Sequence, residues 1–217
     1  MDKAALLKDL RRDLQDEISP FLWQDEELLS YLDQSQIEFC RETGGIADAR
    51  SAFLNIPVGA GTEWVDIDQR IIKIRSAEFV EDGGRRYKLE LMNMEDVEEA
   101  RCPHTLGVPI GLVLGESEDA ARITYIPMVA GELRLIVYRL PLASLMEAYV
   151  EPEIAVEHRP TMLFFAKYLA YMKPDAETFN KDTAEFNLTL FTANCEKARK
   201  EKGRMKHRYR TVRYGGY

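Results

Sequence analysis

The chain has 217 residues, of which 46% are hydrophobic and 30% charged, and its formal net charge is −8. This length and apolar content suffice for a sizeable folded core and exclude an intrinsically disordered chain. No apolar run reaches the roughly 20 residues that cross a membrane, and the charged N-terminus lacks the apolar centre of a signal peptide. We therefore expect a soluble protein, made in a cytosol and without a membrane partner.

Apolar periodicity predicts two helices at the N-terminal end. The first covers residues 2–17, can be capped by Asp2 and is ended by Pro20. Its apolar side chains recur every three or four positions, at Leu6, Leu7, Leu10 and Leu14. The second begins near Asp25, where a run of acids complements the helix dipole, and stops at Gly44.

From about residue 51 the sequence changes to the alternation that is typical of strands. Strand-like segments fall at 52–58, 64–69, 71–80, 87–91, 110–114, 122–126 and 132–138. The Asp82-Gly83-Gly84 sequence predicts a hairpin between the third and fourth of them. A short acidic helix over 94–101, with Asn93 as its cap, is expected to interrupt the strands.

Two helices are predicted again near the C-terminus. One spans 157–171 with Pro160 in its first turn, and its expected buried face is Met162, Phe165, Leu169 and Met172. A long helix should begin at Asp175 and end near Gly203. Its expected buried face is Ala176, Phe179, Thr183, Phe186, Leu190 and Ala193.

This order of elements predicts an α+β fold. Residues 1–50 and 150–203 should form a helical bundle, with an antiparallel β-rich insertion at 51–149. The remaining segment, 204–217, is expected to be an extended basic tail.

The C-terminal segment combines positive charge with aromatic rings. Residues 197–217 hold nine Lys or Arg against one acid, so the segment carries +8 and the rest of the chain −16. Arg and Tyr together are typical of binding hot spots, and either an acidic protein groove or nucleic acid could receive them. A frayed terminus without a function is the alternative. The candidate binding residues are Lys200, Lys202, Arg204, Lys206, Arg208, Tyr209, Arg210, Arg213, Tyr214 and Tyr217.

Arrangements that would support catalysis or metal binding are not evident. Cys102 and His104 could supply two metal ligands, but no second pair follows at a usable spacing. The acids of residues 95–99 fit a solvated helix face better than a cation site or a hydrolase. Cys40 and Cys195 lie far from Cys102 in sequence, which fits reduced thiols acting as small apolar groups. We expect a non-enzymatic protein without cofactor or metal.

Three segments resemble the adaptor, or head-completion, proteins of tailed bacteriophages. They are DLQDEISPFLWQDEELLSYLDQSQIEFCRETGG (13–45), YRLPLASL (138–145) and EPEIAVEHRPTMLFFAKYLAYMKPDAETFNKDTAEF (151–186). The resemblance implies a structural protein of the virion neck that is synthesised in the cytoplasm of the host bacterium. Members of that family form a ring, usually a dodecamer, which docks on the portal and continues the DNA channel into the tail.

The resemblance also implies the partners of the chain. They are the portal protein, which receives the C-terminal segment, neighbouring copies of the chain, a tail or nozzle protein, and genomic DNA that passes without specific binding. A nucleic-acid-binding module that acts through the basic Arg/Tyr tail remains the alternative function.

Overall fold

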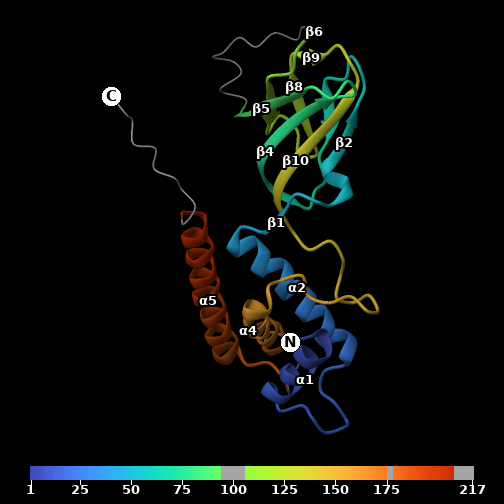
Figure 1. Ribbon diagram of the computed structural model, residues 1–217. Coiled ribbons are helices and arrows are strands. Elements are labelled where there is room, and N and C mark those ends of the chain that lie inside the picture. Colours follow the sequence, from blue (N-terminus) through green and yellow to red (C-terminus); the bar gives the residue numbers. More distant parts are fainter. Residues whose placement is uncertain (94–105, 175–177, 208–217) are drawn as a thin grey trace, which may run out of the picture. The chain divides into compact units, whose positions relative to one another are not determined.

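The computed structural model describes residues 1–93, 106–174 and 178–207, and its fold is α+β (Figure 1). Backbone contacts divide the chain into two compact units. Unit 1 joins Met1–Ile46 with the chain from Pro141 onward, and unit 2 is Ala47–Leu140. The helices are in unit 1 and nearly all of the sheet is in unit 2, so each unit builds its own core.

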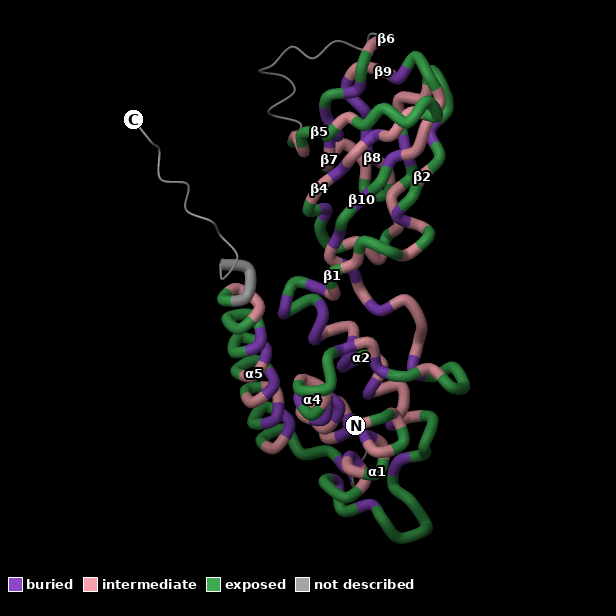
Figure 2. The backbone as a smooth tube through the Cα atoms, viewed as in Figure 1, coloured by how far each residue is buried: buried purple, intermediate pink, exposed green. Residues whose placement is uncertain are grey.

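Unit 1 is built around α4 (Arg159–Tyr171), which packs against α1 (Lys3–Asp13), α2 (Asp25–Thr43) and α5 (Lys181–His207). A short 3₁₀ turn, η2 (Val156–His158), leads into α4. Pro160 lies in the first turn of α4, as predicted, because the first N–H groups of a helix have no intrahelical acceptor. Buried positions lie along the facing sides of these helices (Figure 2).

Capping residues and turns set where the two N-terminal helices begin and end. The Asp2 carboxylate accepts a hydrogen bond from the Ala5 N–H at 2.8 Å, so the predicted cap is confirmed. The first helix ends at Asp13, four residues earlier than predicted, because Asp16 turns back to bind the backbone of the following loop. Gly44 ends α2 in the left-handed conformation, at φ 76°, which glycine adopts at little cost.

Helix α4 buries a different face from the predicted one. Met162 is fully buried, but Leu169 is only half-buried and Met172 is 37% exposed. Ala166 and Ala170, one turn apart, take the inner positions instead. Small side chains there let the backbones of the neighbouring helices approach closely.

The predicted buried face of α5 is wrong where the structure describes it, and Ala176 lies outside the described residues. Phe186 is 62% exposed, whereas the buried face consists of Ala184, Asn187, Phe191, Cys195 and Ala198. The Phe191 ring packs against Phe165 of α4 with ring centroids 4.9 Å apart. The helix also begins later than predicted, at Lys181 with Asn180 as its cap, and continues through Gly203 to His207.

Unit 2 is a mostly antiparallel sheet. Its strand order is β1-β10-β4-β5-β7-β8-β3, and β2 also pairs with β10. The strands are β1 (Ile46–Asp48), β2 (Asn55–Val58), β3 (Trp64–Asp66), β4 (Ile71–Glu81), β5 (Arg86–Asn93), β6 (Leu106–Gly107), β7 (Gly111–Leu114), β8 (Ala120–Thr124), β9 (Ile126–Pro127) and β10 (Gly131–Arg139). A 3₁₀ turn, η1 (Ala52–Leu54), precedes β2 where a strand was expected from residue 52.

The predicted hairpin between β4 and β5 is confirmed, since Gly84 turns the chain at φ 85°. The antiparallel prediction fails at two pairs, because β5 with β7 and β6 with β9 run parallel. Parallel pairing of β5 and β7 requires a long crossover, and the chain from Asn93 to Gly111 supplies the length. The acidic helix predicted for 94–101 lies outside the described residues.

The core of unit 2 is formed by the inward-facing side chains of alternate strand positions. Phe79, Leu112 and Leu133 have no exposed surface. Across the described parts of both units, no helix combines the length and the apolar character that a bilayer span requires.

Candidate partner-binding surface

The predicted binding residues begin on the last turns of α5. Lys200 is exposed, and its ammonium lies 3.6 Å from the Glu196 carboxylate one turn earlier. Arg204 is also exposed, and Lys206 belongs to the final turn of the helix. The other candidates lie outside the described residues; they are Arg208, Tyr209, Arg210, Arg213, Tyr214 and Tyr217.

Lys202 differs from its neighbours because it points into unit 1. Its Nζ donates to the Thr43 hydroxyl at 3.0 Å and to the Gly45 carbonyl at 3.1 Å. It also lies 5.8 Å from the centroid of the Phe39 ring. A cation at this place complements the negative end of α2, so Lys202 joins α5 to α2 within the chain.

The buried face beside Lys202 carries an unreactive thiol. Burial, and then the nearby carboxylates of Glu42 and Glu38, raise the pKa of Cys195 to about 12. The thiol therefore stays protonated at neutral pH and acts as a small apolar group. Cys40 is likewise free and buried, whereas Cys102 lies outside the described residues.

A second exposed surface, which the sequence did not indicate, lies on the loop at 141–155. Tyr149 is 99% exposed and adopts a left-handed backbone conformation, with φ 62°, which is costly for a residue with a side chain. Met146, on the same loop, is 47% exposed. An aromatic side chain that is almost fully exposed, on a left-handed backbone, suits a contact with another molecule.

Side chains of α2 fix the start and the end of this loop. The Asp33 carboxylate accepts hydrogen bonds from the Leu145 N–H at 2.7 Å and from the Ser144 hydroxyl at 2.9 Å. The side-chain oxygen of Gln36, which is fully buried, accepts from the Glu153 N–H at 2.8 Å. These contacts join parts of the sequence more than a hundred residues apart, so no local pattern reveals them.

Two cations complete the attachment of the loop. Lys3 of α1 donates its ammonium to the carbonyl oxygens of Glu147, at 2.7 Å, and Leu145, at 3.2 Å. Arg159 at the start of α4 donates to the carbonyl oxygens of Ile154 and Pro152, at 2.9 and 2.6 Å. The backbone around Tyr149 is thus held from three helices, which reduces the entropy that a binding event would cost.

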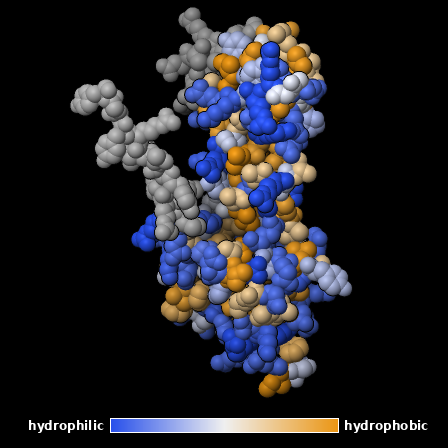
Figure 3. Space-filling model, in the orientation of Figure 1, coloured by the Kyte–Doolittle hydropathy of each residue, from blue (hydrophilic) through white to orange (hydrophobic). Residues whose placement is uncertain are grey.

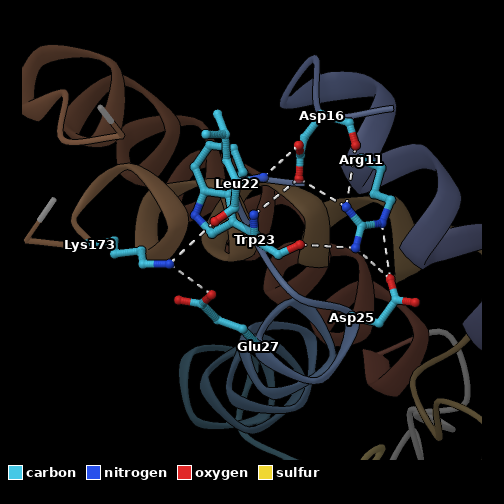
Figure 4. Close-up of polar contacts among 7 residues, drawn as sticks. All are labelled: Arg11, Asp16, Leu22, Trp23, Asp25, Glu27 and Lys173. Atoms are coloured by element: carbon cyan, nitrogen blue, oxygen red, sulfur yellow. Dashed lines mark hydrogen bonds and ion pairs between the residues drawn. The ribbon is translucent and has the colours of Figure 1, made fainter. Parts of the chain in front are cut away.

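A polar cluster holds the loop between α1 and α2 in a similar way (Figure 4). The Asp16 carboxylate, in a residue only 3% exposed, pairs with Arg11 at 2.9 Å and accepts the N–H groups of Leu22 and Trp23. Arg11 also reaches Asp25 at 2.6 Å. These bonds leave the apolar Ile18 and Leu22 at the surface, 84% and 45% exposed.

The outer face of α5 is the third exposed surface of unit 1. It consists of Phe186, the half-buried Leu190 and the exposed Ala193, which recur at helical spacing opposite the buried face. Phe179, just before the helix, is 52% exposed. Apolar side chains reach the surface beside the start of α5, within surroundings that are largely hydrophilic (Figure 3).

The described residues contain no group of three or more His, Cys, Asp or Glu that could hold a metal ion. His104 and the acids of 95–99 lie outside them. Three features of the described surface suit contact with macromolecules: cations at the end of α5, an anchored tyrosine, and an apolar helix face.

Comparison with known proteins gives these surfaces a context. The family model described as SU10 adaptor protein matches residues 1–213. No curated protein matches the chain. Because the match covers nearly the whole sequence, the chain belongs to the SU10 adaptor protein family and is a structural head–tail adaptor protein of bacteriophage.

Proposed function

We propose that this adaptor assembles as a ring, with twelve copies as the family resemblance implies, in the neck of the virion. The ring docks on the portal protein through the end of α5 and the residues after it, and a tail or nozzle protein binds its other side. Synthesis takes place in the host cytoplasm, and no catalysis is required for this role.

The observation that carries the proposal is the position of the cationic segment. Lys202 holds the end of α5 against α2, while Lys200 and Arg204 on the same turns point to solvent. The chain that follows, 208–217, adds three arginines and three tyrosines. A fixed helix end that leads into such a segment suits insertion into an acidic groove, where Arg binds carboxylates bidentately and Tyr buries its ring.

The acidic remainder of the chain suits a passage for DNA. Without residues 197–217 the chain carries −16. Negative walls repel phosphate groups, so genomic DNA would pass through such a ring without specific binding. The DNA-binding alternative needs the opposite, namely a cationic surface that neutralises phosphates.

Truncation after His207 tests the docking proposal. It removes 208–217 but keeps Lys202, so the packing of α5 on α2 is retained. We expect the truncated protein to unfold at the same temperature as the full chain and to lose binding to purified portal in co-sedimentation. Undiminished binding would overturn the assignment.

Two substituted chains separate the contributions of charge and rings. One replaces Arg208, Arg210 and Arg213 by Gln, and the other replaces Tyr209, Tyr214 and Tyr217 by Ser. Portal binding should weaken in both, and only the first should also lose most of its dependence on salt. Affinity of the full chain for duplex DNA that falls steeply with salt, together with unchanged portal binding in both variants, would favour the nucleic-acid-binding module instead.

A further inference from the structure

The loop at 141–155 and the outer face of α5 lie at opposite edges of unit 1 (Figure 1). The loop is held by α1, α2 and the start of α4, whereas α5 packs on α2 and α4 with its other side. One unit therefore presents an exposed aromatic knob on one side and an exposed apolar helix face on the other.

We infer that Tyr149 of one copy packs on the outer face of α5 of the next copy. The inference rests on the proposed ring and names its subunit contact. A ring requires a head-to-tail interface, in which two different patches on different sides of the subunit meet. A twofold contact would instead require one patch that complements itself.

The two patches match in shape and chemistry. Tyr149 is 99% exposed, and the backbone that precedes it is held at Leu145 and Glu147 before any contact forms. On α5, the exposed Ala193 follows Phe186 at a distance of two turns along the same face, with Leu190 between them. The small Ala193 side chain leaves room for a ring to lie against the helix next to Leu190, where a tyrosine buries a large apolar surface.

The charges of the two patches are also complementary. Glu147 and Glu151 flank Tyr149 and are both exposed. The end of α5 that follows the apolar face carries exposed cations at Lys197, Arg199 and Lys200. Attraction between the acidic Tyr149 loop of one copy and the basic end of α5 of the next copy favours a head-to-tail arrangement. Two acidic loops would repel each other, which disfavours pairing of loop with loop.

Disulfide trapping on the portal tests this contact. In a chain with Cys102→Ser, one variant carries Tyr149→Cys, a second carries Ala193→Cys and a third carries both. After oxidation in the presence of portal, the double variant should give a ladder of linked chains on a non-reducing gel. Neither single-cysteine variant should give linked chains by itself. An equal mixture of the two single-cysteine variants should give dimers only, because each chain then has one reactive cysteine.

The substitutions Tyr149→Ala and Phe186→Ala should each lower the occupancy of the portal by adaptor about tenfold or more, as loss of an interface hot spot does. Thr192→Ala is the matched control, since Thr192 is exposed on α5 away from the outer face, and it should leave the occupancy unchanged.

The outcomes separate this inference from the function on which it rests. Dimers from Tyr149→Cys alone, or normal occupancy by Tyr149→Ala and Phe186→Ala, would overturn the contact while leaving the ring in place. If unsubstituted adaptor does not gather on the portal at all, the proposed docking itself is wrong.

Discussion

Lys202 donates to the Thr43 hydroxyl at 3.0 Å, and through this bond the last turns of α5 are joined to the end of α2. The same ammonium reaches the Gly45 carbonyl beyond the end of α2. A lysine among nine clustered cations thus has a structural role, and its neighbour Lys200 does not share it.

Replacing Lys202 by Ala should destabilise unit 1. The change removes two hydrogen bonds from a charged donor and a favourable interaction with the helix dipole, so we expect a loss of about 2 kcal/mol in the free energy of unfolding. Chemical denaturation followed by far-UV circular dichroism measures it. Lys200→Ala is the matched control: its ion pair with Glu196 is exposed, and its removal should not change stability measurably. Equal effects of the two substitutions would show that Lys202 has no special role.

The pair formed by Asp48 and Arg139 makes the stability of unit 2 depend on pH. Both side chains are 8% exposed, and their charged atoms are 2.5 Å apart. Burial opposes ionisation of Asp48, but hydrogen bonds from Ser51, Arg139 and the backbone outweigh it and hold its pKa well below the ordinary range. A carboxylate with a lowered pKa stabilises the fold at neutral pH, and this contribution is lost as the pH falls from about 4 towards the folded-state pKa.

Asp48→Asn should therefore cost about 3 kcal/mol at pH 7, because it removes the carboxylate charge that pairs with Arg139 in a buried site. The cost should shrink as the pH is lowered below about 4, where the unsubstituted protein also loses the ionised carboxylate. Thermal unfolding between pH 3 and pH 7 checks both parts. Glu132→Gln, which breaks the exposed pair with Arg134, should show neither effect; a constant cost of Asp48→Asn at every pH would contradict the assignment.

Gly131 is required by close packing at the start of β10. A Cβ atom at this position would lie 2.3 Å from the Val80 carbonyl oxygen and 2.8 Å from the Phe79 ring. Phe79 is fully buried and the Val80 carbonyl belongs to the backbone of the paired strand β4, so Gly131→Ala should cost about 3 kcal/mol of unit 2 stability. Gly83→Ala in the β4–β5 turn meets no atom within 4 Å and should be neutral, which makes it the control for the glycine-to-alanine change itself. A neutral Gly131→Ala would mean that β10 can shift away from β4.

Sequence patterns predicted the elements that local chemistry determines. Asp2, Gly44 and the turn at Gly84 act on their own neighbours, and the structure has them where the sequence indicated. The face that α5 buries could not be predicted, because the helix carries two apolar stripes. The stripe with Phe186 has the larger apolar side chains in the sequence. The stripe with Ala184 and Ala198 is nevertheless the one that is buried against the other helices.

The missed parts of the candidate surface depend on contacts between distant residues. Asp33 and Lys3 look like ordinary surface charges in the sequence, yet both bind the backbone of the loop that carries Tyr149. Nothing in the spacing of Tyr149 marks it as exposed. The cluster of Lys and Arg residues could be recognised from the amino-acid composition of the C-terminal segment. Only the fold shows that Lys202 points inward whereas Lys200 and Arg204 point to solvent.

The role of Asp33 provides a test of whether the Tyr149 loop must be rigid. Asp33→Ala removes the acceptor for the Leu145 N–H and the Ser144 hydroxyl without touching any exposed residue of the loop. We expect amide exchange to speed up at Leu145, and stability to fall by about 2 kcal/mol, since both donors lose a charged partner. Gln34→Ala, at an exposed position next to Asp33 on α2, should change neither.

The same substitution should weaken assembly although Tyr149 itself is intact. A loosened loop must be ordered again on binding, and this entropy cost reduces affinity without any loss of contact area. In the disulfide experiment, adding Asp33→Ala to the double-cysteine chain should shorten the ladder and slow its appearance. If the exchange at Leu145 rises while the ladder forms as fast as before, Tyr149 binds its neighbour without being preorganised, and the left-handed backbone at this residue has another cause.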